Sequence, residues 1–217
     1  MLDSKGGFDE IEFNTPNLVL FAYPCISQSF DPMIRHSTHL KACMRCYPTN
    51  HIDAIWFQKL RLFLTKKNGF KVLNLYISAI GQKFTDIEKL KAIELPPYEL
   101  EHVELLLDFL EESSAYIPFV DAVLWCCRPR SLTLRSSVPF EEQGDVVKFT
   151  YKKLLEQEDH TSIQIVGPSS SEAQKQLRDL KSLSVGLCRD GNSISFIKEE
   201  VVQEEALNQR FADMEIF

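Results

Sequence analysis

The chain has 217 residues, a length that a single domain can fill, and its 44% hydrophobic and 25% charged residues are typical of a globular protein. Its formal net charge of −7 argues against a surface that follows nucleic-acid phosphates. No apolar run approaches the ~20 residues that a membrane-spanning helix needs. The opening residues, MLDSKGGFDEIEF, lack the apolar core of a secretory signal. We therefore expect an intracellular protein, in the nucleus or cytoplasm, that binds neither nucleic acid nor membrane.

Short segments with two apolar residues around one variable position recur along the chain. The five most regular start 30, 29, 31 and 31 residues apart, and they are LNL (73–75), VEL (103–105), LTL (132–134), IQI (163–165) and ISF (194–196). Two less regular members precede them, LVL (18–20) and LKA (40–42). Alternating apolar residues are typical of strands, and a repeat of this length is typical of a solenoid.

Helical patterns lie between several of these strands. Residues 51–67 place an apolar stripe on one face, with Gly69 as a stop signal, and the stripe consists of Ile52, Ile55, Trp56, Leu60, Phe63 and Leu64. Residues 115–126 and 170–182 predict two further helices. Two segments fit the repeat poorly. Residues 91–100 hold an additional strand-like piece, and DVVKFTYKKLL (145–155) is typical of a strand where the spacing predicts a helix.

The alternation predicts an α/β fold, specifically a leucine-rich-repeat-like β-α solenoid with a pitch of about 30 residues. A curved parallel sheet would carry the helices on its convex side, because a helix that returns the chain to a parallel neighbour makes a right-handed crossover. We expect the solenoid to span residues 1–198 and the acidic residues 199–217 to form a C-terminal cap or tail.

Four motifs, in this order and spacing, resemble the C-terminal leucine-rich-repeat region of plant F-box/leucine-rich-repeat proteins of the FBD type. They are EIEFNTPNLVLFAY (10–23), HIDAIWFQKLRLFL (51–64), IELPPYELEHVELLL (93–107) and FVDAVLWCCRPRSLTL (119–134). The resemblance implies the part of a cullin-RING ubiquitin ligase receptor that holds its target protein. The chain departs from the family in lacking an F-box, the segment that binds a Skp-type adaptor, so adaptor binding is expected only if an F-box lies upstream.

The expected function is therefore that of a protein-interaction scaffold and not of an enzyme, with a protein target and no cofactor. The alternative is a free-standing truncated regulator that competes for the same target without a link to ubiquitin ligation. In either case the outward-pointing strand residues would form the binding surface. Tyr and Arg dominate the binding energy of protein interfaces. The candidates are Asn74, Tyr76, Glu104, Thr133, Arg135, Gln164 and Ser195.

The cysteines offer competing interpretations. Cys43 and Cys46, with three histidines nearby, have the spacing of one half of a zinc site, but a second pair is missing and a strand would turn the two thiols to opposite faces. We therefore expect no metal there. A cysteine nucleophile would need a base nearby in space, and no local motif supplies one. For Cys126 and Cys127 the resemblance implies buried packing at a helix exit, with Arg128-Pro129-Arg130 turning the chain into the next strand.

Overall fold

The computed structural model describes residues 11–14, 20–23, 32–35, 40–46, 52–65, 69–78, 87–93, 96–108, 116–136, 143–157, 161–168, 185–188 and 193–200. Three α-helices lie in these ranges, α1 (Ala54–Thr65), α2 (Tyr116–Cys126) and α3 (Gly144–Glu156), together with the 3₁₀ helix η1 (Ile87–Ala92). The strands are β1 (Ile11–Asn14), β2 (Leu20–Tyr23), β3 (Pro32–Arg35), β4 (Leu40–Cys46), β5 (Phe70–Ser78), β6 (Tyr98–Asp108), β7 (Cys127–Ser136), β8 (Thr161–Pro168), β9 (Val185–Cys188) and β10 (Ser193–Glu200).

The strands form a mixed sheet, so the predicted leucine-rich-repeat solenoid is wrong, although strands and helices do alternate as in an α/β protein. The eight-stranded sheet has the order β2-β4-β5-β6-β7-β10-β8-β9, and β1 pairs with β3 in a separate small sheet. From β2 to β7 the pairing is parallel, but β10 is antiparallel to both of its neighbours, β7 and β8. A solenoid requires β8 to follow β7, and β10 occupies that place instead.

The reversal of β10 has a physical reason in the length of the connection before it. Only four residues separate Cys188, the last residue of β9, from Ser193, the first residue of β10. A parallel return needs a crossover of a dozen or more residues. Because β9 runs parallel to β8, a strand that follows β9 so closely is antiparallel to β8.

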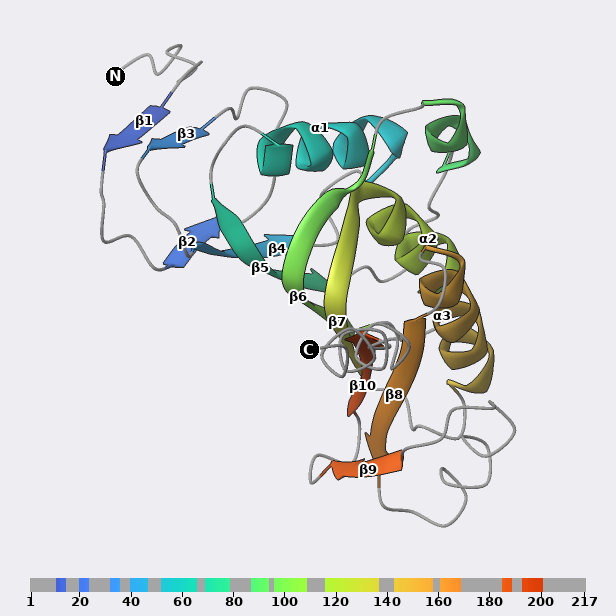
Figure 1. Ribbon diagram of the computed structural model, residues 1–217. Coiled ribbons are helices and arrows are strands. Elements are labelled where there is room, and N and C mark those ends of the chain that lie inside the picture. Colours follow the sequence, from blue (N-terminus) through green and yellow to red (C-terminus); the bar gives the residue numbers. More distant parts are fainter. Residues whose placement is uncertain are drawn as a thin grey trace, which may run out of the picture.

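The hydrophobic core lies between the sheet and its helices. The helices α1, α2 and α3 cover the same face of the sheet (Figure 1). Alternate strand residues are buried against them, among them Leu73, Leu75, Val103, Leu105, Leu132, Leu134, Ile163, Ile165, Ile194 and Phe196. Aromatic rings pack between the helices, since the ring centroids of Phe57 in α1 and Phe119 in α2 lie 5.7 Å apart. Burial of each such side chain stabilises the fold by about 1.5–3 kcal/mol.

Two helices agree with the sequence pattern and one does not. Residues 54–65 and 116–126 are helical as predicted, except that Ile55 is 59% exposed and Phe57 takes its place in the core. Residues 144–156 form α3, so the strand predicted over 145–155 is wrong. Val146, Val147, Thr150 and Leu154 share its buried face. That helical spacing outweighs the strand preference of the β-branched residues, because tertiary burial overrides intrinsic propensity.

The Cys126–Cys127 pair marks the junction that the sequence predicts. Helix α2 ends at Cys126, β7 begins at Cys127, and both side chains are fully buried. The expected turn over Arg128-Pro129-Arg130 is wrong, because β7 already includes these residues and Pro129 lies opposite Leu100 of β6. Proline is tolerated there because β10 pairs with β7 only over residues 131–135, so Pro129 has one strand beside it among the described residues.

Several predicted features lie outside the described residues. The helix over 170–182 is one of them. The predicted boundary at residue 198 falls inside β10, which continues to Glu200, and residues 201–217 are not described. Among the helices that the structure describes, none is long and apolar enough to cross a membrane.

An engineered disulfide tests the position of β10. Thr133 and Ser195 lie directly opposite each other, with hydroxyl oxygens 2.8 Å apart. Opposed residues of antiparallel strands have the Cα separation that a disulfide needs. We expect T133C/S195C to form an intramolecular disulfide on oxidation, seen as a 2 Da mass loss that peptide mapping assigns to this pair.

The matched control is T133C/Q164C. In a solenoid of parallel strands, β8 would lie beside β7 and this pair would form readily. In the observed order β10 separates the two strands, so the Cα atoms are at least about 9 Å apart and should not bridge. Efficient cross-linking of the control would contradict the observed strand order.

Candidate interaction surface

The sheet has a second face that none of the described helices covers (Figure 1). Side chains alternate along each strand, so the residues between the buried ones point to this side. We call it the open face. Its described residues are Val72, Asn74 and Tyr76 of β5, His102, Glu104 and Leu106 of β6, Ser131, Thr133 and Arg135 of β7, Ser195 and Ile197 of β10, and Gln164 and Val166 of β8. All seven residues predicted from the sequence lie on it.

Four of the predicted residues form one continuous row across neighbouring strands. The Cα register runs from Asn74 to Glu104, then to Thr133 and to Ser195. Asn74 Nδ2 donates a hydrogen bond to Glu104 Oε2 over 2.7 Å. The hydroxyl groups of Thr133 and Ser195 lie 2.8 Å apart. Side-chain hydrogen bonds therefore link the row in two pairs, Asn74 with Glu104 and Thr133 with Ser195.

The other predicted residues flank this row. Two residues further along these strands, on the same face, Tyr76 lies beside Leu106, and Leu106 lies beside Arg135. Gln164 lies on the opposite side of the row, next to Ile197 of β10. The predicted neighbourhood of Gln164 and Thr133 is wrong for the reason given above, since β10 separates their strands.

An ion pair fixes the centre of the open face. Arg135 Nε lies 3.0 Å from Glu104 Oε1, so the Glu104 carboxylate interacts with Arg135 through one oxygen and with Asn74 through the other. The Glu104 side chain is 23% exposed and that of Arg135 is 48% exposed. Solvent screens such a pair, which contributes at most about 1 kcal/mol to stability. Its larger effect is to orient two neighbouring side chains.

A shallow cavity of about 180 Å³ opens beside this ion pair. Its lining includes Tyr76, Glu104, Leu106 and Arg135, together with Cys43 of β4. The Oδ1 atom of Asn74, which is also in the lining, is buried and has no hydrogen-bond partner among the described residues. The cavity therefore combines an apolar side, an aromatic ring and polar groups, which is the mixture found at specific protein interfaces.

Sequence reasoning did not name the other six residues of this surface, Val72, His102, Leu106, Ser131, Val166 and Ile197, nor Cys43 of β4, which lies beside Asn74. Leu106 was hidden in the apolar run LLL (105–107), in which alternation alone marks the middle residue as outward-facing. His102 Nδ1 lies 2.8 Å from Ser131 Oγ. Burial lowers the pKa of His102 below its ordinary value, and the nearby Glu104 only partly offsets this effect.

The buried cysteines lack the properties of a nucleophile. The Cys126 thiol donates to the carbonyl of Phe57 over 3.3 Å, and the Cys127 thiol donates to the carbonyl of Val123 over 3.2 Å. Burial raises the pKa of Cys126 and raises that of Cys127 to about 12, despite the neighbouring Arg61. Both groups are therefore neutral thiols at physiological pH, and the thiolate is the reactive form.

Both cysteines of the CxxC motif lie in β4, three residues apart. Cys43 lies beside Asn74, and Cys46 lies beside Ile77 three positions further along. His36, His39 and His51 lie outside the described residues. Within the described part of the chain, no three His, Cys, Asp or Glu side chains come together as a metal site would require.

Comparisons with known proteins give no relative. No family model matches the chain, and neither the curated proteins nor the solved structures contain a match. The resemblance to F-box/leucine-rich-repeat proteins therefore rests on the four motifs in the sequence.

The lowered pKa of His102 predicts a pH dependence of stability. The unfolded histidine titrates near pH 6.5, and the folded one titrates lower. Between these two values the unfolded chain binds more protons, so stability rises with pH. We expect the free energy of unfolding, measured in urea, to fall as the pH drops through 6.5 and to level off below the folded pKa.

Histidine NMR supplies the direct measurement. The His102 ring signal should titrate below pH 6.5, and H102Q should remove this part of the pH dependence of unfolding. A His102 signal that titrates above pH 6.5 would contradict the burial of the ring against Ser131.

Proposed function

We propose that this chain is a protein-interaction scaffold that binds a target protein on the open face. One observation carries the proposal. Residues from β5, β6, β7, β10 and β8 form a continuous surface, on which Asn74 and Arg135 contact Glu104 and Thr133 contacts Ser195. The helices pack on the opposite side and give this surface a rigid support.

The composition of the open face supports protein binding. Tyr76 and Arg135 belong to the residue types that dominate interface hot spots, and they flank Leu106 in the centre of the surface. Thr133, Ser195 and Gln164 supply donors and acceptors around them. A preorganised platform of this kind loses little conformational entropy on binding.

The link to ubiquitin ligation is a separate part of the proposal and rests on the sequence motifs. In the ligase proposal, an intracellular target held on the open face would be presented to a cullin-RING ligase through a Skp-type adaptor. The alternative is a free-standing regulator that holds the same target without the ligase. A pull-down of the endogenous full-length protein with the Skp-type adaptor separates the two.

A paired-variant capture experiment tests the binding surface. We expect Y76A/R135A to lose at least one partner that the unmodified chain captures from cells, with the affinity for that purified partner reduced roughly tenfold or more. The readout is quantitative mass spectrometry, followed by the Kd of the purified partner from calorimetry.

The control variant carries the same kinds of substitution on the helical side. L62A/K89A removes one exposed apolar side chain from α1 and one exposed lysine from η1. It should keep the partner that Y76A/R135A loses. If every captured protein binds both variants equally well, the open face is not the binding surface.

A further inference from the structure

One residue of the open face is a histidine, the side chain whose ordinary pKa places its change of charge between pH 5 and 8. His102 of β6 lies in a row that crosses the sheet from Lys41 of β4 through Val72, His102 and Ser131 to Ile197 of β10. Of the five histidines in the chain, it is the one that the structure describes. The open face therefore carries a titratable group on its surface.

Hydrogen bonds assign the position of the proton on the neutral ring. The hydroxyl of Ser131 donates to the carbonyl of Glu101 over 3.2 Å. The oxygen of this hydroxyl then accepts from His102 Nδ1, which lies 2.8 Å away. The neutral ring therefore carries its hydrogen on Nδ1, and a second proton has to bind at Nε2.

The surroundings give a protonated ring little compensation for its charge. The register partners of His102 on β5 and β7 are uncharged. The Glu104 carboxylate lies on the same strand and face, but Arg135 and Asn74 already contact its two oxygens, at 3.0 and 2.7 Å. Burial and the ammonium group of Lys41 both favour the neutral ring, and their effect on the pKa of His102 outweighs that of Glu104.

A partner of ordinary size that binds the open face covers this ring. A standard interface buries about 800 Å² on each side, which corresponds to a disc of about 16 Å radius. His102 is two residues from Glu104 along β6, a distance of about 7 Å, so it lies within such a disc centred on the ion pair of Glu104 with Arg135. The partner removes the remaining water from the ring, and an unpaired charge is costly to bury.

We propose that His102 makes binding at the open face dependent on pH, because the complex requires the neutral ring. This inference rests on the proposed function, since it concerns the same surface. A chain with a protonated His102 has to release that proton before a partner covers the ring. The affinity is therefore greatest above the pKa of His102 in the free chain and falls as the pH drops below it, by at most about tenfold for each pH unit.

The test uses the purified partner that the unmodified chain captures and that Y76A/R135A loses. Its Kd is measured by calorimetry between about pH 5 and pH 8, with the unmodified chain and with H102Q, which keeps an uncharged side chain capable of hydrogen bonds. We expect the Kd of the unmodified chain to rise several-fold on acidification relative to that of H102Q. Titrating groups of the partner act on both Kd values alike, so the ratio of the two isolates His102.

Proton release supplies a readout that a merely structural role of His102 would not change. Near the pKa of the free ring, binding should release a fraction of a proton, so that the measured binding enthalpy depends on the ionisation enthalpy of the buffer. H102Q should lose this part of the buffer dependence. The matched control is H160Q, which removes a different histidine and should behave like the unmodified chain.

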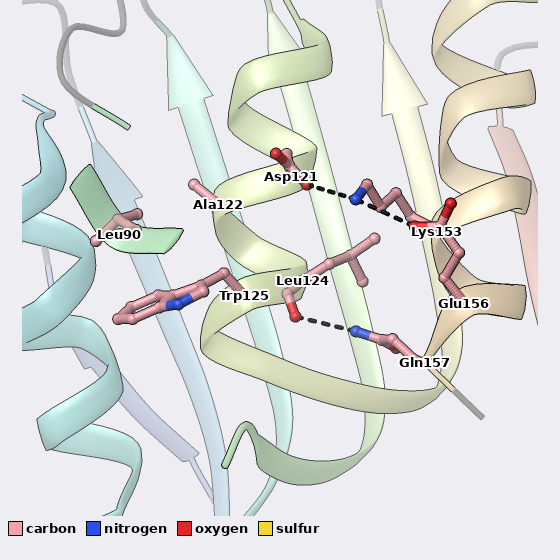
Figure 2. Close-up of a pocket in the computed structure, with 8 residues that line it drawn as sticks. All are labelled: Leu90, Asp121, Ala122, Leu124, Trp125, Lys153, Glu156 and Gln157. Carbon is pink, nitrogen blue, oxygen red and sulfur yellow. Dashed lines mark hydrogen bonds and ion pairs between the residues drawn. The ribbon is translucent and has the colours of Figure 1, made fainter. Parts of the chain in front are cut away.

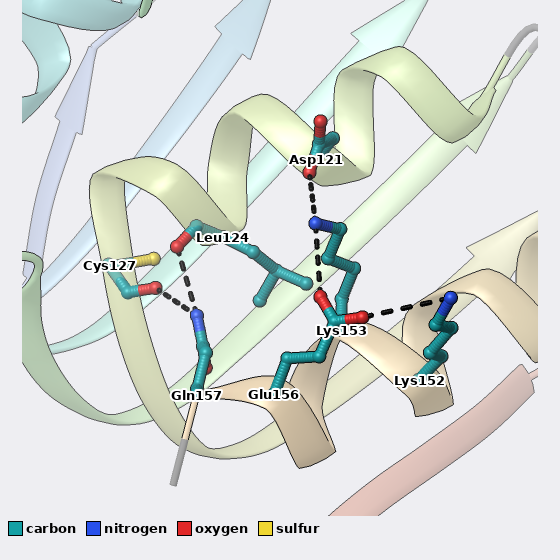
Figure 3. Close-up of polar contacts among 7 residues, drawn as sticks. All are labelled: Asp121, Leu124, Cys127, Lys152, Lys153, Glu156 and Gln157. Carbon is teal, nitrogen blue, oxygen red and sulfur yellow. Dashed lines mark hydrogen bonds and ion pairs between the residues drawn. The ribbon is translucent and has the colours of Figure 1, made fainter. Parts of the chain in front are cut away.

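The helical side of the molecule provides a second control. A groove of about 300 Å³ lies beside α2, with Ala122 and Trp125 among its lining residues (Figure 2). The described residues that line it include no histidine. Figure 3 shows Lys153 between two carboxylates of this lining, with its Nζ 3.7 Å from Asp121 and 3.2 Å from Glu156. D121N/K153Q removes one of these ion pairs and should leave the pH dependence of binding unchanged.

The NMR signal of the His102 ring gives a readout that does not depend on the folding of any variant. In the unmodified chain it should titrate at a lower pH in the complex than in the free chain. A pKa that the partner leaves unchanged or raises would overturn the proposal, and so would an equal pH dependence of the Kd in H102Q. The open-face function stands in both of these cases, whereas a chain that captures no partner through the open face overturns both proposals.

Discussion

The common register of β5, β6 and β7 is the constraint on which the rest of this structure depends. It places Leu73, Val103 and Leu132 side by side, and each is fully buried beneath the helices. Because strand residues alternate between faces, the same register aligns Asn74, Glu104 and Thr133 on the other side. A shift of one residue in any of these strands would move its apolar residues into solvent. Core and surface are therefore specified by one arrangement of the backbone.

Strand direction is the feature that the apolar pattern left undetermined. The segment ISF (194–196) buries Ile194 and Phe196 and turns Ser195 outward, and such a pattern reads the same in either direction. The 31-residue spacing predicted a further parallel strand, but the pattern is equally compatible with the antiparallel strand that β10 forms. Turn residues supply the missing signal, because DGN (190–192) lies between β9 and β10 and is typical of a short reversal. This turn distinguishes β10 from the parallel series.

Helices α1 and α2 and the outward-facing strand residues were predictable, because each rests on local periodicity. Errors arose where periodicity and propensity disagreed, as in α3, where two valines and two aromatic residues favour a strand and the burial of Val146, Thr150 and Leu154 favours a helix. The groove beside α2, which Trp125 lines, was not predictable from the sequence. It brings Leu90 together with Asp121 and Lys153, and no local pattern specifies how three separate helical segments pack.

The contact between Arg61 and Trp125 links the packing of the helices to the shape of the surface. A fully charged guanidinium is expensive to bury unless its donors and its charge are compensated. Here the Trp125 carbonyl accepts a hydrogen bond and the indole ring stabilises the charge. The cost of burial makes alternative packings of α1 against α2 unfavourable, since they would leave the charge without these partners. The same contact that specifies the helix packing therefore also fixes the position of Trp125, which lines the groove beside α2.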